Sequence, residues 1–178
     1  IIDDDVVDIT NLHRQVLYTE EEAGQPKVEC AKRRLQALNS EVEIDAYHMR
    51  LTKDNAKELI SRYDIVVDGI DNFATRYIVS DECQRQGKPY VYGAIRGLEG
   101  QVAVLCKGHC TYRSLLPDEE ATLSMPHPGK AVLGTTPAVV GSVEACQVLQ
   151  LVAEMGEPLV DKLWTVDLST MMSYVIEM

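Results

Sequence analysis

The sequence predicts an α/β fold with a mostly parallel sheet flanked by helices and an antiparallel extension toward the C-terminus. Three observations support this prediction. The continuous apolar run at 64–68 is typical of a parallel strand buried on both faces. Segments with helical periodicity alternate with strand-like segments, and two strand-like segments alone close the chain. Because 178 residues suffice for one core, we expect a single domain over 1–178.

The first elements are a strand end, a helix and a strand. Ile1-Ile2 has the pattern of a strand end, and since the chain starts there rather than at a methionine, we expect an upstream segment to be missing. Pro26 suits a first helical turn, where its missing N–H costs nothing, and apolar residues follow at helical spacing over 27–38. Alternation over 41–48 predicts a strand with one exposed face.

Two further helices surround the apolar run. Helical spacing predicts one over 53–62, with Thr52 as its cap. Asp71-Asn72 opens the other, which continues to about Gln86, and Gly87-Lys88-Pro89 ends it. With the strand between them, these helices give the Rossmann-like alternation of the predicted sheet.

The second half contains strands, a long loop and a long apolar helix. Residues 114–135 show little periodicity and are predicted to form a loop. The helix predicted from Thr136-Pro137 to about Met155 is apolar almost all round, so it is either the buried central helix of a monomer or part of a subunit interface. The interface interpretation favours a homodimer. The strands predicted here are 90–93, 101–106, 163–167 and 171–176.

Composition excludes several classes of function. Seventeen Lys and Arg against 28 Asp and Glu give a net charge of −11, which repels phosphate backbones and argues against nucleic-acid binding. No uninterrupted apolar run approaches the length of a membrane span, so no membrane association is expected. The five cysteines are scattered without a CxxC pair, which is typical of reduced thiols in a cytoplasmic protein.

Candidate anion ligands cluster near the start of the chain. Asp3-Asp4-Asp5 ends the first strand, where an acid binds a ribose hydroxyl in doubly wound folds or simply forms a solvated turn. Asn11 and Arg14 share a face if their loop makes a helical turn, and the planar fork of Arg14 matches phosphate. Lys27 lies on the first turn of a helix, where it either adds to an anion site or is a solvated lysine.

Two carboxylates bracket the end of the apolar strand. Ligands in such sheets bind outside the carboxyl ends of strands, so Asp68 and Asp71 are placed to hold Mg²⁺ on a triphosphate. Asp71 has a second interpretation as the cap of the helix that Asn72 enters. The sequence contains neither GxGxxG nor GxxxxGK, so the glycine-rich element of a nucleotide site would lie upstream of Ile1.

Cys106, His109 and Cys110 suggest a metal site, but the sequence offers no second ligand pair. Structural zinc requires four ligands, so a zinc site is not expected there.

Several short motifs occur in a fixed order and spacing, and together they resemble the ThiF/MoeB/HesA adenylyltransferases, bacterial relatives of ubiquitin-activating enzymes, over nearly the whole chain. The motifs are Asp3-x-Asp5-x-Val7, Asn11-Leu12-x-Arg14-Gln15, Gly24-Gln25-Pro26-Lys27-Val28-Glu29, Asp68-x-x-Asp71-Asn72-x-x-x-Arg76, Gly93-Ala94, Glu99-Gly100-Gln101, Tyr112-Arg113 and the helix containing Gly141-Ser142.

The resemblance implies an enzyme that binds ATP and Mg²⁺. It would activate the C-terminal glycine carboxylate of a small ubiquitin-fold sulfur carrier ending Gly-Gly, giving an acyl-adenylate and pyrophosphate. By motif position, Asp3 would hold the ribose, Asn11, Arg14 and Lys27 the phosphates, and Asp71 the Mg²⁺. The implied cofactor-binding residues are Asp3, Asp5, Asn11, Arg14, Lys27, Asp71 and Asn72, of which Arg14, Lys27 and Asp71 are the catalytic residues.

The chain departs from the family pattern in two further places. Many members bind zinc through cysteine pairs, the first of which would flank Tyr112-Arg113. Here Thr111 and Ser114 occupy those positions, and because hydroxyls are poor zinc ligands we expect no zinc. Some members carry a cysteine before the long apolar helix and join it to the carrier. The loop at 114–135 has none, so we expect adenylation without a covalent link.

Two other functions compete with adenylation. A non-catalytic scaffold subunit of a ubiquitin-like activation system would share the fold, but it would need none of Arg14, Lys27 and Asp71. A dinucleotide-dependent oxidoreductase would explain Asp3 at a strand end, but it would leave Arg14 and Lys27 without a role.

Overall fold

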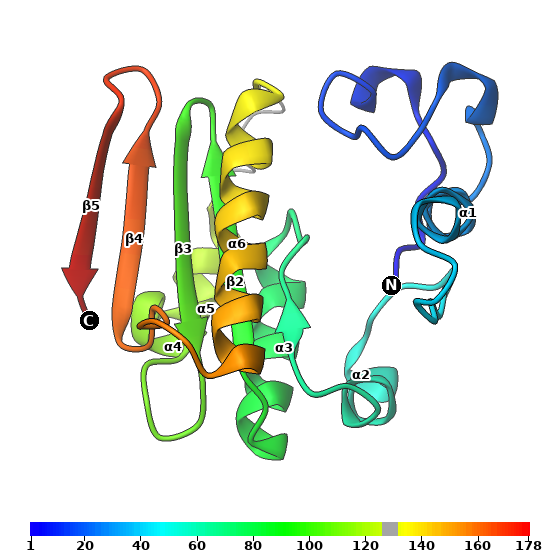
Figure 1. Ribbon diagram of the computed structural model, residues 1–178. Coiled ribbons are helices and arrows are strands. Elements are labelled where there is room, and N and C mark those ends of the chain that lie inside the picture. The colour runs from blue at the N-terminus through cyan, green and yellow to red at the C-terminus, as the bar shows by residue number, and fades with distance from the viewer. Residues whose placement is uncertain (126–131) are drawn as a thin grey trace. The chain divides into compact units, whose positions relative to one another are not determined.

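The computed structural model describes residues 1–125 and 132–178. The chain divides into two compact units, Ile1–Leu51 and Thr52–Met178 (Figure 1). The expectation of a single domain over 1–178 stays a prediction.

The first unit contains one α-helix and two short 3-10 helices. The α-helix α1 spans Lys27–Leu38 and begins after Pro26, as predicted, because a proline at the N-cap loses no helical hydrogen bond. The helix buries Val28 and Ala31. The 3-10 helices are η1 (Ile9–Asn11) and η2 (Glu20–Glu22).

The predicted strand at 41–48 is wrong. Only Tyr47 forms a strand-like bridge. Its N–H donates to the Ile1 carbonyl at 2.9 Å, and its carbonyl accepts from the Asp3 N–H at 3.2 Å, which makes an isolated parallel bridge centred on Ile2. Val42 is 51% exposed, so the alternation buries little apolar surface. An alternating pattern produces a strand only where a neighbouring strand accepts its hydrogen bonds.

The second unit is built on a five-stranded sheet in the order β1-β2-β3-β4-β5. The α/β class and the antiparallel extension are confirmed, but the strands pair parallel only between β1 and β2 in this sheet, so its described strands are mostly antiparallel. The strands are β1 (Val66–Val67), β2 (Tyr90–Arg96), β3 (Glu99–Leu105), β4 (Lys162–Asp167) and β5 (Met172–Glu177).

The first strand differs from its prediction. We expected the run at 64–68 to be buried on both faces, yet β1 is two residues long and Val67 is 49% exposed. The strand lies at the edge of the sheet and contacts only β2 among its strands. Apolar continuity identified the strand correctly but not its place in the sheet.

Helices α2 (Lys53–Ser61) and α3 (Phe73–Gln86) match their predictions. A reciprocal capping box between Thr52 and Asn55 starts α2. Gly87 ends α3 in the left-handed conformation (φ 68°), which favours glycine. These boundaries depend on a few adjacent residues, so the sequence alone locates them.

The predicted loop at 114–135 contains helical structure instead. Helix α4 spans Tyr112–Leu115, and α5 spans Glu119–Ser124. Each begins at a capping side chain: Thr111 Oγ1 accepts from the Ser114 N–H at 3.2 Å, and Asp118 Oδ1 accepts from the Ala121 N–H at 2.9 Å. Residues 126–131 of the predicted loop lie outside the described residues.

Arg113 joins these short helices to α3. Its guanidinium donates two hydrogen bonds to the Asp81 carboxylate, both 2.8 Å, and forms an ion pair with Glu119 at 2.8 Å. Tertiary contacts of this kind stabilise helices that are too short to form alone.

Helix α6 (Thr135–Ala153) lies across β2 and β3 (Figure 1). Val140 packs there in a cluster of buried valines that includes Val91, Val102 and Val104. Leu149 and Val152 are exposed, at 65% and 68%. The helix therefore covers the sheet with one side and leaves apolar side chains uncovered on another, a combination of the two predicted environments.

By length and composition alone, α6 is long and apolar enough to cross a membrane. Core helices of other folds share this length and composition, and α6 buries Glu144 and Gln147 against its own unit. The expectation of no membrane association stays a prediction.

Two hairpins complete the sheet. β2 and β3 extend beyond their predicted ends to a two-residue turn, Gly97-Leu98, where Gly97 has φ 59°. The β4–β5 hairpin is close to its prediction, and every residue of β5 is exposed.

Candidate functional site

The first unit holds Lys27 against Asp5. Lys27 is 5% exposed, and its Nζ donates to Asp5 Oδ2 at 2.8 Å. The Lys27 N–H also donates to the Asp5 carbonyl at 3.0 Å, so both ends of the lysine are fixed by one residue. Lys27 is thus a buried, paired cation at a helix N-terminus rather than a solvated lysine. Its ammonium group has two donors besides the one that Asp5 accepts.

Asn11 and Arg14 meet as their spacing predicted. The Arg14 N–H donates to the Asn11 carbonyl at 3.0 Å, which makes the helical turn, and Arg14 Nη2 donates to Asn11 Oδ1 at 2.5 Å. The amide holds one edge of the guanidinium and leaves its other donors available. Such a fork suits the paired oxygens of a phosphate.

Asp3 lies beside Asp5 in a turn. Asp3 Oδ1 accepts from the Asp5 N–H at 2.8 Å. Carboxylate oxygens of Asp3, Asp4 and Asp5 come within 4.8 Å of one another, the only such group of His, Cys, Asp or Glu found among residues 1–125 and 132–178. Cys106, His109 and Cys110 therefore do not converge on a shared metal position. His109 Nδ1 instead contacts Asp161 Oδ2 at 2.7 Å.

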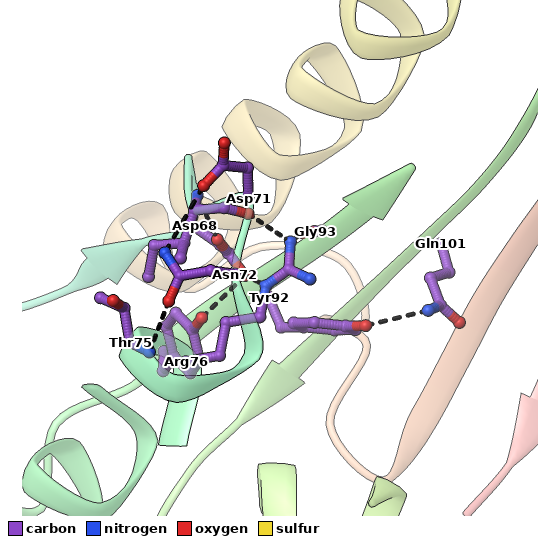
Figure 2. A network of polar contacts seen from close by, with 10 residues as sticks. Asp68, Asp71, Asn72, Thr75, Arg76, Tyr92, Gly93 and Gln101 are labelled. Atoms are coloured by element: carbon purple, nitrogen blue, oxygen red, sulfur yellow. Dashed lines mark hydrogen bonds and ion pairs between the residues drawn. The ribbon is translucent and has the colours of Figure 1, made fainter. Parts of the chain in front are cut away.

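In the second unit, a buried ion pair organises the turn after β1. Arg76 Nε donates to Asp68 Oδ2 at 2.9 Å, and Arg76 Nη2 donates to the carbonyls of Ile70 and Gly93 at 2.6 and 2.9 Å (Figure 2). Asp68 also accepts from the Tyr90 hydroxyl at 2.7 Å and from the Ile70 N–H at 2.7 Å. One arginine thus ties α3, β2 and the turn together.

The environment of this pair is aromatic and dry. Burial raises the pKa of Asp68, while the Arg76 guanidinium beside it opposes that shift. The guanidinium lies 5.3 Å from the centre of the Tyr92 ring, and the Tyr92 hydroxyl accepts from Gln101 at 2.9 Å (Figure 2). Both oxygens of Asp68 are used by the protein, so Asp68 is a structural carboxylate rather than a free metal ligand.

Asp71 is exposed, whereas Asp68 is buried, so only Asp71 is accessible to a ligand. The capping role that the sequence left open for Asp71 belongs to Asn72, whose Oδ1 accepts from the Thr75 N–H at 2.9 Å (Figure 2). Asn72 Nδ2 also contacts Asp71 Oδ1 at 3.5 Å. Capping by Asn72 and the Arg76 contacts fix the backbone on both sides of Asp71 and leave its carboxylate to solvent, where hard cations bind oxygen.

Glu144 on α6 is another buried carboxyl of this unit. It is 6% exposed, and its Oε1 has no hydrogen-bond partner. The carboxyl rests against Gly93: a Cβ at position 93 would lie 2.8 Å from Oε2 and closer still to Oε1 and Cδ. Burial, and then the charge of Asp68, raise the pKa of Glu144 to about 8. Gly93 thus leaves the space that the Glu144 carboxyl fills.

Gly93→Ala is expected to lower the free energy of unfolding by about 1–3 kcal/mol, because the new methyl group overlaps the Glu144 carboxyl. Urea denaturation measures the change. Gly69→Ala is the matched control, since a Cβ at position 69 meets no atom within 4 Å. Equal stability of the two variants would contradict the close packing of Glu144 on Gly93.

Thr111 and Ser114, at the positions of the expected zinc pair, bond to one another. Their hydroxyl oxygens lie 3.3 Å apart, and Ser114 Oγ accepts from the Thr111 N–H at 3.0 Å. The pair serves as a helix cap. Hydroxyls so used do not fit a zinc site, which prefers thiolate and imidazole.

Sequence reasoning assigned no role to Arg76 or Glu144. The signal for Arg76 in the sequence was its place in the motif Asp68-x-x-Asp71-Asn72-x-x-x-Arg76. Glu144 had a clearer signal, because it is the only charged residue of the helix Thr135–Ala153. A charge on an apolar helix calls for a specific partner.

The second unit is an α/β structure with an acidic turn at the carboxyl end of β1, and the first unit holds a buried cation at a helix start. A model of the ThiF family matches residues 1–178. The chain belongs to the ThiF family.

Similar proteins bear related names. The sulfur carrier protein adenylyltransferase of Thermus thermophilus is 45% identical over 175 residues, which cover 94% of this chain and 64% of that protein. The adenylyltransferase and sulfurtransferase MOCS3 of Arabidopsis thaliana is 40% identical, covering 94% and 36%. The SAMP-activating enzyme E1 of Haloferax volcanii is 38% identical, covering 89% and 59%. The chain thus spans between about a third and two thirds of these relatives.

Solved structures agree on the fold. The crystal structure of E. coli MccB with ATP superposes with a TM-score of 0.82 at 25% identity, over 99% of this chain and 55% of MccB. The crystal structure of E. coli MccB with MccA-N7isoASN gives the same TM-score at 22% identity.

Proposed function

We propose that this chain is the core of an ATP-dependent adenylyltransferase that acts on the C-terminal glycine of a small ubiquitin-fold sulfur carrier ending Gly-Gly. The main support is the exposed Asp71 carboxylate on its fixed turn. The nearby Asp68 already accepts hydrogen bonds from Arg76 and Tyr90, whereas among the described residues Asp71 contacts only Asn72 at 3.5 Å and can bind a cation. Three similar proteins named for adenylation or carrier activation support it.

In the proposed reaction, an oxygen of the carrier carboxylate bonds to the α-phosphorus of ATP. The bond from that phosphorus to the bridging oxygen breaks, and pyrophosphate leaves. The carboxylate is already ionised at neutral pH, so the reaction needs charge neutralisation and positioning rather than a general base. Mg²⁺, when bound, would neutralise phosphate charge.

Each candidate residue has a part in this proposal. Asp71 would hold Mg²⁺, and Asn72 positions Asp71 through the helix cap. Arg14, oriented by Asn11, and Lys27 would bind phosphate oxygens. Asp3 would hold the ribose, and Asp5 orients Lys27 through their ion pair. A homodimer that covers the exposed Leu149 and Val152 is part of the same proposal.

Carrier-dependent exchange of pyrophosphate into ATP, measured with the full-length protein, tests the function. Asp71→Asn and Arg14→Ala are each expected to lower the exchange rate about a hundredfold or more, because each removes a group that stabilises phosphate charge. Asp64→Asn, at the other end of the apolar run, and Arg34→Ala are matched controls on exposed side chains and should leave the rate unchanged.

The exchange should also require the terminal glycine of the carrier. A folded protein that catalyses no exchange with any Gly-Gly carrier would favour the scaffold subunit instead. Normal exchange rates in both variants would show that Asp71 and Arg14 do not act in the site, without contradicting adenylation.

A further inference from the structure

Two buried carboxyls of the second unit are linked to one guanidinium in different ways. Asp68, at the end of β1, pairs directly with Arg76 of α3, whereas Glu144 of α6 packs on Gly93, whose carbonyl accepts from Arg76. Arg76 carries one positive charge, so Asp68 and Arg76 together are neutral. Ionisation of Glu144 would leave a net negative charge in the interior, which is costly without a second cation.

Hydrogen bonds decide which carboxyl holds the proton. Asp68 accepts from the Arg76 guanidinium, the Tyr90 hydroxyl and the Ile70 N–H, all of which favour its ionised form. Glu144 Oε1 has no donor. The proton therefore belongs on Glu144, and the two groups titrate as a coupled pair.

Among the described residues, no other charge compensates Glu144 from the elements that pack on α6. The side of β2 and β3 that faces α6 presents Val91, Gly93, Val102 and Val104, all uncharged. Tyr90 and Tyr92 alternate with Val91 and Gly93 along β2, so they lie on the opposite face. Asp68 and Arg76 are thus the charged groups that act on Glu144.

Gly93 connects Glu144 to the candidate site. The Glu144 carboxyl packs against the Cα of Gly93. The Gly93 carbonyl accepts from Arg76 Nη2 at 2.9 Å (Figure 2). Arg76 in turn holds the Ile70 carbonyl and Asp68, which flank the turn that leads to Asp71. A change at Glu144 therefore reaches Asp71 through one side chain.

We propose that Glu144 is a positioning residue. While its carboxyl, packed on Gly93, is neutral, Arg76 stays bonded to Asp68 and to the turn 68–72. When the carboxyl ionises, it attracts the Arg76 guanidinium away from these partners. Glu144 would then gate the site by its protonation, without touching a ligand.

The NMR resonance of the Arg76 Nε–H group, assigned with Arg76→Lys, tests this proposal without any substrate. In the wild type the resonance should shift with pH, with a midpoint near the pKa of about 8 given to Glu144 by its surroundings. In Glu144→Gln, which keeps the shape but cannot ionise, the shift should be absent. Glu154→Gln, on an exposed carboxylate at the end of α6, should titrate like the wild type.

Two results would overturn the proposal. One is a wild-type Arg76 resonance that stays constant for about two pH units on either side of the midpoint. The other is a shift that persists in Glu144→Gln, because another group would then cause it.

The consequence for catalysis rests on the proposed function. Pyrophosphate exchange by the wild type should fall about tenfold relative to Glu144→Gln at one pH unit above the midpoint. Exchange that is absent at every pH, together with an Arg76 resonance that titrates as expected, would reject adenylation and support the positioning role. Exchange with the same alkaline fall in both proteins would reject the gate.

Discussion

Arg76→Met is expected to lower the free energy of unfolding by about 3–5 kcal/mol, because it leaves Asp68 as a buried carboxylate without its cation. The Asp68 side chain is 0% exposed, so water cannot replace the lost guanidinium. Methionine keeps much of the arginine's length, which separates the charge effect from a cavity. Urea denaturation followed by circular dichroism measures the change.

Two further variants make this result specific. Arg62→Met removes an arginine whose ion-pair partner, Glu58, has a side chain that is 75% exposed, and it should change stability by about 0.5 kcal/mol or less. Asp68→Asn combined with Arg76→Met removes both charges and should recover part of the loss. A loss below about 1 kcal/mol in Arg76→Met would show that the pair is solvated.

Glu144→Gln is expected to stabilise the protein at pH 7 by about 3 kcal/mol and to remove a pH dependence. A glutamate in the unfolded chain ionises near 4.5, whereas burial raises the pKa of Glu144 in the native state to about 8. Between these values the native state binds one more proton than the unfolded state. The free energy of unfolding contributed by this group is therefore highest below pH 4.5, falls as pH rises, and is constant above pH 8.

The measurement is the difference in unfolding free energy between wild type and Glu144→Gln across that range. The difference should grow with pH at up to about 1.4 kcal/mol per unit, because other titrating groups cancel. Glu154→Gln should show no such trend. A difference independent of pH would mean that Glu144 is ionised in the native protein.

Local sequence rules predicted several elements well. The start of α1 after Pro26, the capping box at Thr52, and the limits of α3 at Asn72 and Gly87 match the structure closely. Each depends on the backbone geometry and hydrogen bonds of a few consecutive residues, and these are present in the sequence itself. The contact between Asn11 and Arg14 was predictable for the same reason, since they are three residues apart.

Long-range pairing decided the elements that were predicted wrongly. The alternation at 41–48 found no partner strand, so it made one bridge. The segment before α6 gained two short helices because Arg113 pairs with Asp81, which is distant in the sequence. The position of β1 at the sheet edge also followed from pairing.

The sequence by itself determined the α/β class, the limits of α1, α2 and α3, and the candidate residues Arg14, Lys27 and Asp71, because motif order and local capping are encoded in neighbouring residues. Only the tertiary structure decided that Asp68 is buried and paired while Asp71 is exposed, and that Arg76 and Glu144 both contact Gly93. These roles depend on burial and on which charges meet, and both arise from residues that only folding brings together.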